Sequence, residues 1–462
     1  MAEKSAIPVE LGTEKIGRLL KQYALPAIIA QTASSLYNMV DSIFIGQGVG
    51  PLAISGLAVT FPLMNLSTAF GTLVGAGAAT MLSVLLGQKN YKAANKVLGN
   101  VVSLNVILGF IFMAVALIFI DPILYFFGAS ENTLPYAKEY IQIILYGNIV
   151  THLYFGLNAA MRSSGHPKKA MALTIFTVVF NTILDPIFIF VFDMGIAGAA
   201  WATVIAQTVA MILVMRHFSD RSRAFHFEKG IFKFDPRVAK DSLTIGMGPF
   251  LMNTAACLVT LFINQQLRDY SGDLGIGSYG ICNRFIFMFI MICMGLNQGM
   301  QPIAGYNYGA KQYSRVKEVF WMTAKFGTIV TTICFCIGMF IPRLAAGIFT
   351  HDEALLNMSA EGMRILTIGF PIVGFQMIGT NFFQCLGMVK KSIILSLSRQ
   401  LLFLLPLLYS LPFWMGANGV WMSFPISDVL SALLTAILLR RLFKKFNMLK
   451  DGEESSILGS NL

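Results

Sequence analysis

Three of the 23 carboxylate side chains lie deep inside long apolar stretches, at Asp41, Asp185 and Asp428. A charge at the centre of a bilayer costs about 2.5–3.5 kcal/mol on insertion scales, so each of these side chains requires a partner or a function. Two carboxylates in one dry pocket can take up and release a proton, because burial and like charge favour the neutral acid. With other oxygen atoms they can instead coordinate a sodium ion. The sequence therefore predicts an ion-binding site inside the membrane.

Polar side chains accompany Asp185 at helical spacing. Asn181 lies one turn earlier on the same face of a helix. Pro186 removes one backbone donor and so frees a carbonyl group to bind a ligand. The next apolar stretch begins near residue 197 and brings Thr203 and Gln207 to the same depth.

Asp41 has polar neighbours of its own, because Asn38 lies three residues earlier with Tyr37 beside it. Asp41 and Asp185 are both expected in the outer half of the membrane. A proton or a sodium ion suits these oxygen atoms equally well. The residues predicted to couple the cation, and to act as metal ligands if that cation is sodium, are Asp41, Asn181, Asp185 and Thr203.

Four cationic side chains also fall inside predicted spans, at Arg284, Lys325, Arg364 and Arg399. Arg399 lies at a depth comparable to that of Asp428, and we predict a structural ion pair between them. Arg284 lies in the outer half of its stretch, at the level of Asp41. It either neutralises an aspartate in one conformation or extends to the membrane surface.

The 25 methionines and 38 phenylalanines supply an apolar lining for a substrate cleft. Methionine side chains adapt to varied shapes, and aromatic faces bind organic cations. Most of these residues are expected to pack against lipid and neighbouring helices. The candidates for the substrate cleft are Tyr37, Asn38, Gln207, Arg284, Phe287, Met288 and Met291.

Helices that cross a membrane must position these residues. Of the 462 residues, 56% are apolar and 12% are charged, which is about half the charged fraction of a soluble domain. Most of the apolar stretches exceed the roughly 20 residues that a membrane-spanning helix needs. We predict twelve spans, near residues 21–45, 52–86, 97–120, 134–160, 169–192, 197–216, 241–267, 276–306, 316–341, 355–386, 392–414 and 417–439.

The basic residues indicate which side of the membrane each loop occupies. The two termini and the loops on their side hold 27 of the 34 lysines and arginines, whereas the opposite loops hold Lys138, Arg268 and Arg343. The positive-inside rule therefore places both termini in the cytoplasm, in a multi-pass protein of the plasma (inner) membrane. The net charge of +11 reflects this orientation, and nucleic acid is not expected as a partner.

The two halves of the chain repeat one another. Gly87-Gln-Lys-Asn-Tyr91 aligns with Gly309-Ala-Lys-Gln-Tyr313, and after a change of register by one position Met194-Gly-Ile-Ala-Gly198 aligns with Met415-Gly-Ala-Asn-Gly419. Each copy holds six spans, so both copies have the same orientation. The predicted fold class is an all-α integral membrane protein, with twelve transmembrane helices in two six-helix bundles related by a pseudo-two-fold axis along the membrane normal. The predicted domains are an N-terminal bundle at 1–218, a cytoplasmic connecting loop at 219–239, a C-terminal bundle at 240–446 and a polar cytoplasmic tail at 447–462.

The sequence lacks the motifs of common enzyme classes. It contains neither a G-x-x-x-x-G-K-[ST] phosphate loop nor an H-E-x-x-H zinc motif. All six cysteines lie within predicted spans, where small packing residues are expected and a disulfide framework is not. We therefore expect no enzyme and no cofactor.

Three motifs resemble those of the MATE (multidrug and toxic compound extrusion) family. They are Asp41-Ser-Ile-Phe-Ile-Gly46, Asn181-Thr-Ile-Leu-Asp185-Pro186 and the run Gly195-Ile-Ala-Gly198-Ala-Ala-Trp201-Ala-Thr203. The resemblance covers residues 12–446 and is strongest to the DinF-like branch. It implies an antiporter that exports cationic lipophilic compounds in exchange for protons or sodium by alternating access. It also implies a cation site at Asp41, Asn181, Asp185 and Thr203. A fourth-span tyrosine of that region in the family would match Tyr140, which joins the candidates for the substrate cleft.

Two other functions compete with this interpretation. One is a flippase for lipid-linked precursors within the wider superfamily, which would need a strongly cationic cavity. The other is a membrane scaffold or membrane enzyme without a transport role. We expect a monomer whose partners are small organic cations, protons or sodium ions, and membrane lipid.

Overall fold

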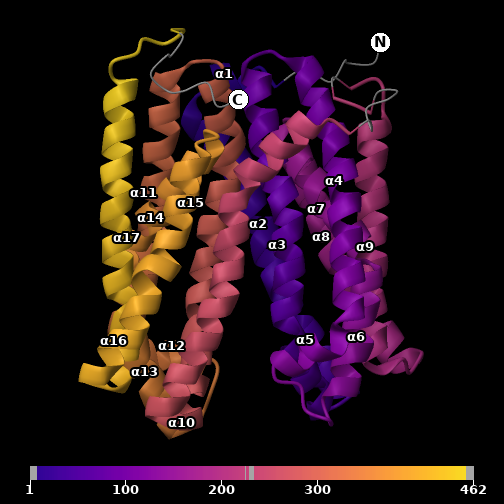
Figure 1. Ribbon diagram of the computed structural model, residues 1–462, viewed down its shortest axis with the longest axis vertical. Helices are drawn as coiled ribbons and strands as arrows, with labels where there is room; N and C mark the ends of the chain where they lie inside the picture. Colours follow the sequence, from indigo (N-terminus) through magenta and orange to yellow (C-terminus); the bar gives the residue numbers. More distant parts are fainter. Residues whose placement is uncertain (1–7, 224, 228–233, 454–462) are drawn as a thin grey trace. The chain divides into compact units, whose positions relative to one another are not determined.

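The computed structural model describes residues 8–223, 225–227 and 234–453, apart from the side chains of residues 38, 39, 51 and 273. The long elements of this described chain are all helices (Figure 1). Nine of them are long and apolar enough to cross a membrane, and the bent pair formed by α13 and α14 makes ten. The prediction of an all-helical membrane protein is confirmed.

The first compact unit contains the described residues up to Thr13 together with Ile29–Phe250. Its short α1 (Glu10–Thr13) precedes α2 (Ile16–Gly48), of which the later part belongs to this unit. The other elements are α3 (Pro51–Gly87), α4 (Tyr91–Ile118), α5 (Ile120–Phe126), α6 (Leu134–Tyr146), α7 (Asn148–Ser163), α8 (Pro167–Pro186), the π-helix η1 (Ile187–Val191), α9 (Gly195–Ser219) and the start of α10 (Pro236–Gly309).

The second compact unit contains Glu14–Ile28 and the described chain from Leu251 onward. The long α10 has a non-helical residue at Gly272, which divides it into two candidate spans. The elements that follow are α11 (Tyr313–Phe340), α12 (Pro342–Gly347), α13 (Glu353–Thr367), α14 (Phe370–Cys385), α15 (Val389–Leu397), the π-helix η2 (Ser398–Leu404), α16 (Leu405–Met415) and α17 (Ala417–Phe446).

Each unit also includes a helical segment from the opposite half of the sequence. Residues 14–28 pack in the second unit, where the backbones of Ala24 and Gly299 approach closely. Residues 236–250 pack in the first unit, where Gly77 lies against the carbonyl group of Ser242. Glycine permits these approaches because it has no side chain to separate the helices.

Polar contacts fix the start of α10 on the first unit. The backbone N–H of Asp235 donates to Oδ1 of Asn100 on α4 (3.2 Å). The Asp235 carboxylate accepts from the backbone N–H of Arg237 (3.1 Å) and lies 3.6 Å from Nζ of Lys96. The hydrogen bond from Arg237, supported by Lys96, holds the pKa of Asp235 below its usual value. The carboxylate therefore stays ionised and keeps this end of the helix attached to α4.

The backbone reproduces the internal repeat. Lys89 and Lys311, which occupy the same position in the aligned motifs of the two copies, both adopt left-handed conformations with φ near 60°. Gly147 separates α6 from α7, and its counterpart Gly369 separates α13 from α14, where the chain bends by 55°. The fifth span of each copy also contains a π-helical segment, at the end of the span in the first copy and within it in the second. The repeat predicted from the sequence is therefore confirmed.

Candidate functional site

Three helices of the first unit supply the predicted ion-binding residues. Asp41 comes from α2, Asp185 and Asn181 come from α8, and Thr203 comes from α9. The fractional exposure is 5% for Asp41, 0% for Asp185, 2% for Asn181 and 7% for Thr203. Both carboxyl groups are therefore removed from solvent.

The hydroxyl group of Thr203 joins the three helices. It forms a hydrogen bond with the phenol of Tyr37 on α2 (2.8 Å). It also accepts a hydrogen bond from Nδ2 of Asn181 on α8 (3.3 Å). Because that amide nitrogen faces Thr203, Oδ1 of Asn181 remains available to a ligand.

Four oxygen atoms of these residues have no hydrogen-bond partner among the described residues. They are Oδ1 of Asp41, Oδ1 of Asn181 and both carboxylate oxygens of Asp185. In folded proteins about nine in ten buried polar atoms are paired. Within the described chain neither aspartate forms an ion pair with a lysine, arginine or histidine. These oxygens are suited to a proton or to a cation that prefers oxygen ligands.

The two aspartates and two tyrosines lie close enough to interact electrostatically. Asp185 interacts with Asp41, and both carboxyl groups interact with the phenols of Tyr37 and Tyr140. Tyr140 is 1% exposed and packs in an apolar cluster with Ile45 and other residues of the first unit. This apolar cluster limits the access of water to the acidic pair.

The backbone changes its geometry directly after Asp185. Pro186 ends α8, and the next five residues form the π-helix η1. Proline cannot donate the hydrogen bond that continues an α-helix, and π-helical segments frequently lie at functional sites. The helix therefore departs from α-helical geometry directly after Asp185.

Two of the remaining candidates from the first unit differ in their surroundings. The side-chain oxygen of Gln207 accepts a hydrogen bond from the hydroxyl of Thr151 on α7. One polar atom of Gln207 is therefore paired within the helix packing. The side chain of Asn38 lies outside the described part of the structure. Their roles in the substrate cleft stay predictions.

The candidates from the second unit lie on one stretch of α10. Arg284 is exposed, Phe287 and Met288 are 43% and 59% exposed, and Met291 is half-buried. The neighbouring Phe285 is only 5% exposed and belongs to the core of the unit. One face of this helix is therefore exposed to a ligand or to lipid, and the role of these residues in the substrate cleft stays a prediction.

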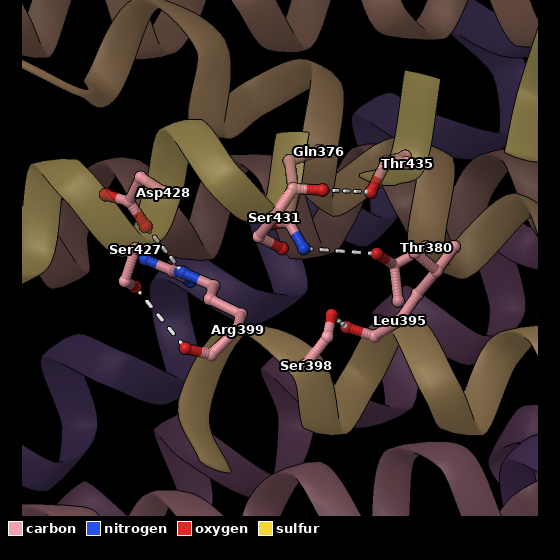
Figure 2. A network of polar contacts seen from close by, with 9 residues as sticks. All are labelled: Gln376, Thr380, Leu395, Ser398, Arg399, Ser427, Asp428, Ser431 and Thr435. Atoms are coloured by element: carbon pink, nitrogen blue, oxygen red, sulfur yellow. Dashed lines mark hydrogen bonds and ion pairs between the residues drawn. The ribbon is translucent and has the colours of Figure 1, made fainter. Parts of the chain in front are cut away.

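The contact between Arg399 and Asp428 is also present. Nε of Arg399 donates to Oδ1 of Asp428 (2.7 Å), as Figure 2 shows. The predicted ion pair, which follows from the similar depth of the two residues in their spans, is confirmed.

A buried polar cluster between α3 and α7 was not predicted. His152 is fully buried, and its Nε2 lies 2.9 Å from the carbonyl oxygen and 3.2 Å from the hydroxyl of Ser67. The same hydroxyl donates to Asn148, which in turn donates to the carbonyl of Gly109 (3.3 Å). The spacing of Asn148 and His152, one helical turn apart, is the signal that indicates this cluster.

Comparison with known proteins adds independent findings. The family model described as MatE matches residues 26–187 and 246–410. The multidrug export protein MepA of Staphylococcus aureus (strain MRSA252) is 28% identical over 91% of this chain and 93% of its own. MepA of Staphylococcus haemolyticus is 26% identical over 91% of this chain and 92% of its own.

Solved structures match the fold over almost the whole chain. A structure of the MATE multidrug transporter DinF-BH is 36% identical, with a TM-score of 0.89, and covers 97% of this chain and 100% of its own. An outward-facing MATE family transporter of the MOP superfamily reaches a TM-score of 0.90 at 22% identity, over 97% of this chain and 100% of its own. The second likeness concerns the fold alone.

Proposed function

Because the chain belongs to the MATE family, we propose that it exports small organic cations from the cytoplasm in exchange for protons or sodium ions. The observation that carries this proposal is the set of four unpaired oxygens on Asp41, Asn181 and Asp185. The names of the relatives, multidrug export protein and MATE multidrug transporter, support organic compounds as the substrates. The exposed aromatic and methionine face of α10 supports cations among them.

We infer that ion binding at this site supplies the energy for export. A cation that enters from the outside yields about 2.3 kcal/mol per charge for each 100 mV of membrane potential. A proton would neutralise one of the two aspartates. A sodium ion would instead be held by oxygens of Asp41, Asn181, Asp185 and Thr203, a set that fits a cation preferring oxygen ligands. The proposed cycle is alternating access, with both termini in the cytoplasm and a monomer as the working unit.

Proteoliposomes with an imposed gradient test this function. We expect a fluorescent organic cation to move against its own gradient when a pH gradient or a sodium gradient is imposed in the opposite direction. The two gradients are applied separately, so that the coupling ion is identified. If neither gradient moves the dye in vesicles that contain folded protein, the antiporter proposal is wrong.

Removing only the hydroxyl group of Thr203 tests the ion-binding site without changing a charge. Replacing it by Thr203→Val removes the group that orients Tyr37 and Asn181. The substitution removes two hydrogen bonds, each worth about 0.5–1.5 kcal/mol, so we expect the apparent affinity for the coupling ion to fall by at least about fivefold. The measurement is the dependence of dye export on pH or sodium concentration.

Thr208→Val is the matched control on the same helix. The hydroxyl of Thr208 donates to the carbonyl of Val204 (2.7 Å), a contact within α9. Its removal is expected to leave ion affinity unchanged. Equal effects of the two substitutions would show that Thr203 has no special role in ion binding.

A further inference from the structure

The second unit holds a buried carboxylate that already has a cation. Asp428 on α17 is 2% exposed and accepts a hydrogen bond from Nε of Arg399 (2.7 Å). Arg399 belongs to the π-helix η2, and its side chain is 25% exposed whereas that of Asp428 is 3% exposed. Arg399 is thus the more exposed partner, and Asp428 is the enclosed one.

The pair lies at a place where the helices of the second unit depart from regular geometry. A methyl group added to Gly369, at the bend between α13 and α14, would lie 3.2 Å from Oδ2 of Asp428. In the register that aligns Met194 with Met415, the internal repeat matches Asp428 with Gln207. Gln207 forms a neutral hydrogen bond with Thr151. The two copies of this position therefore differ in charge.

Two serines, Ser427 and Ser431, neighbour Asp428 along α17. The hydroxyl of Ser427 donates to the carbonyl oxygen of Arg399 (3.3 Å). Ser431 is fully buried, lies three residues after Asp428 on the same face of α17, and its hydroxyl has no partner among the described residues. In Figure 2 the side chains of Ser427, Asp428 and Arg399 lie together, whereas Ser431 lies beside Gln376. Without the guanidinium group, this site would resemble the unpaired acidic site of the first unit.

We propose that Arg399 is a built-in cation that keeps Asp428 out of ion coupling, so that coupling is confined to the first unit. Ionisable side chains within spans almost always face the interior of a bundle or a water-filled cavity, so the Arg399 side chain, which is 25% exposed, marks the route to the carboxylate. The first unit has carboxyl groups without a fixed cation among the described residues, and the second has a carboxylate with one. This inference rests on the proposed antiport function.

The proposal predicts the number of ions that move with each dye molecule. In the Arg399→Gln variant, Asp428 loses its fixed cation and takes one from the outside solution, which it releases to the cytoplasm in each cycle. We expect this variant to move about one more ion per dye than the wild type. The measurement is the ratio of ion influx to dye efflux in proteoliposomes, together with the gradient at which dye flux reverses.

Two matched variants separate this role from a structural one. The double variant Arg399→Gln with Asp428→Asn removes both charges and is expected to keep the wild-type ratio. Arg399→Lys retains a cation and is also expected to keep it. If folded Arg399→Gln protein transports dye at the wild-type ratio, the pair serves only the packing of the helices and the proposal is wrong.

If the Arg399→Gln protein does not fold, the Arg399→His variant provides the test. The imidazole of Arg399→His carries a charge near pH 5.5 and loses it near pH 8, on either side of an ordinary value of about 6.5. We expect the wild-type ratio at the acidic pH and about one additional ion at the alkaline pH. A ratio that is the same at both pH values contradicts the proposal. Failure of the wild-type protein to couple dye to any gradient would instead contradict the antiport function itself.

Discussion

Replacing either Asp41 or Asp185 with asparagine is expected to lower gradient-driven dye export by at least about tenfold, equivalent to about 1.4 kcal/mol. Asparagine keeps the shape of the side chain but can neither release a proton nor supply a negative charge to sodium. Both carboxyl groups are buried, and Oδ1 of Asp41 and both oxygens of Asp185 have no hydrogen-bond partner among the described residues. Initial rates of dye export in proteoliposomes measure the effect.

The same substitutions are expected to leave thermal stability unchanged or to raise it. A buried carboxyl group without a partner costs free energy, and neutral asparagine removes that cost. Stability retained at the expense of function is typical of residues that serve a site. A lowered melting temperature with normal transport would mean that these aspartates are structural.

Asp121→Asn is the matched control for both substitutions. Asp121 forms an ion pair with Lys138 (2.8 Å), and the two side chains are 45% and 36% exposed. Exposed ion pairs contribute about 0–1 kcal/mol, so this variant is expected to fold and to transport as the wild type does. If Asp121→Asn lost export to the same extent, the effect at Asp41 and Asp185 would reflect a general loss of carboxylates.

Substituting Gly246→Val is expected to produce the largest loss of stability. A side chain at Gly246 would overlap the carbonyl group of Leu73 on α3, and one at Gly77 would overlap the carbonyl of Ser242. The backbones must therefore separate. Overpacking of this kind costs about 1–3 kcal/mol and occasionally more. Fluorescence-detected size-exclusion chromatography after heating measures the fraction of folded protein.

Gly280→Ala is the control for that substitution, because it lies on the same helix in open space. No atom lies within 4 Å of the position that its Cβ would occupy. Alanine is favoured over glycine within helices by up to about 1 kcal/mol, so stability is expected to stay the same or to rise slightly. Equal destabilisation by the two substitutions would refute the close approach of α3 and α10.

Residue type and helical spacing were enough to locate the acidic site. Asp41 and Asp185 stood out because they are charged within apolar stretches, and Asn181 because it lies one turn from Asp185. The hydrogen bond between Tyr37 and Thr203 joins residues 166 positions apart, and local periodicity does not reveal such a contact. It depends on how α2 and α9 pack, which is decided by side chains along their whole lengths.

The sequence also does not reveal how the spans pack against one another. The spans followed from the apolar stretches and the repeat from aligned motifs, and Lys89 and Lys311 show that the backbone obeys the repeat. The packing of residues 14–28 and 236–250 with the opposite halves did not follow from the sequence. Apolar periodicity shows which face of a helix is buried, but not which helix covers it.

The segments that the two units exchange have a consequence for synthesis of the protein at the ribosome. Domains generally fold in the order in which they are made, yet the first unit lacks residues 236–250 until the connecting loop has been translated. Residues 14–28 must likewise wait for partners in α10, such as Gly299, which are translated much later. Neither half therefore reaches its final packing as an independent nascent domain, and the newly inserted helices must remain soluble in lipid until the other half arrives.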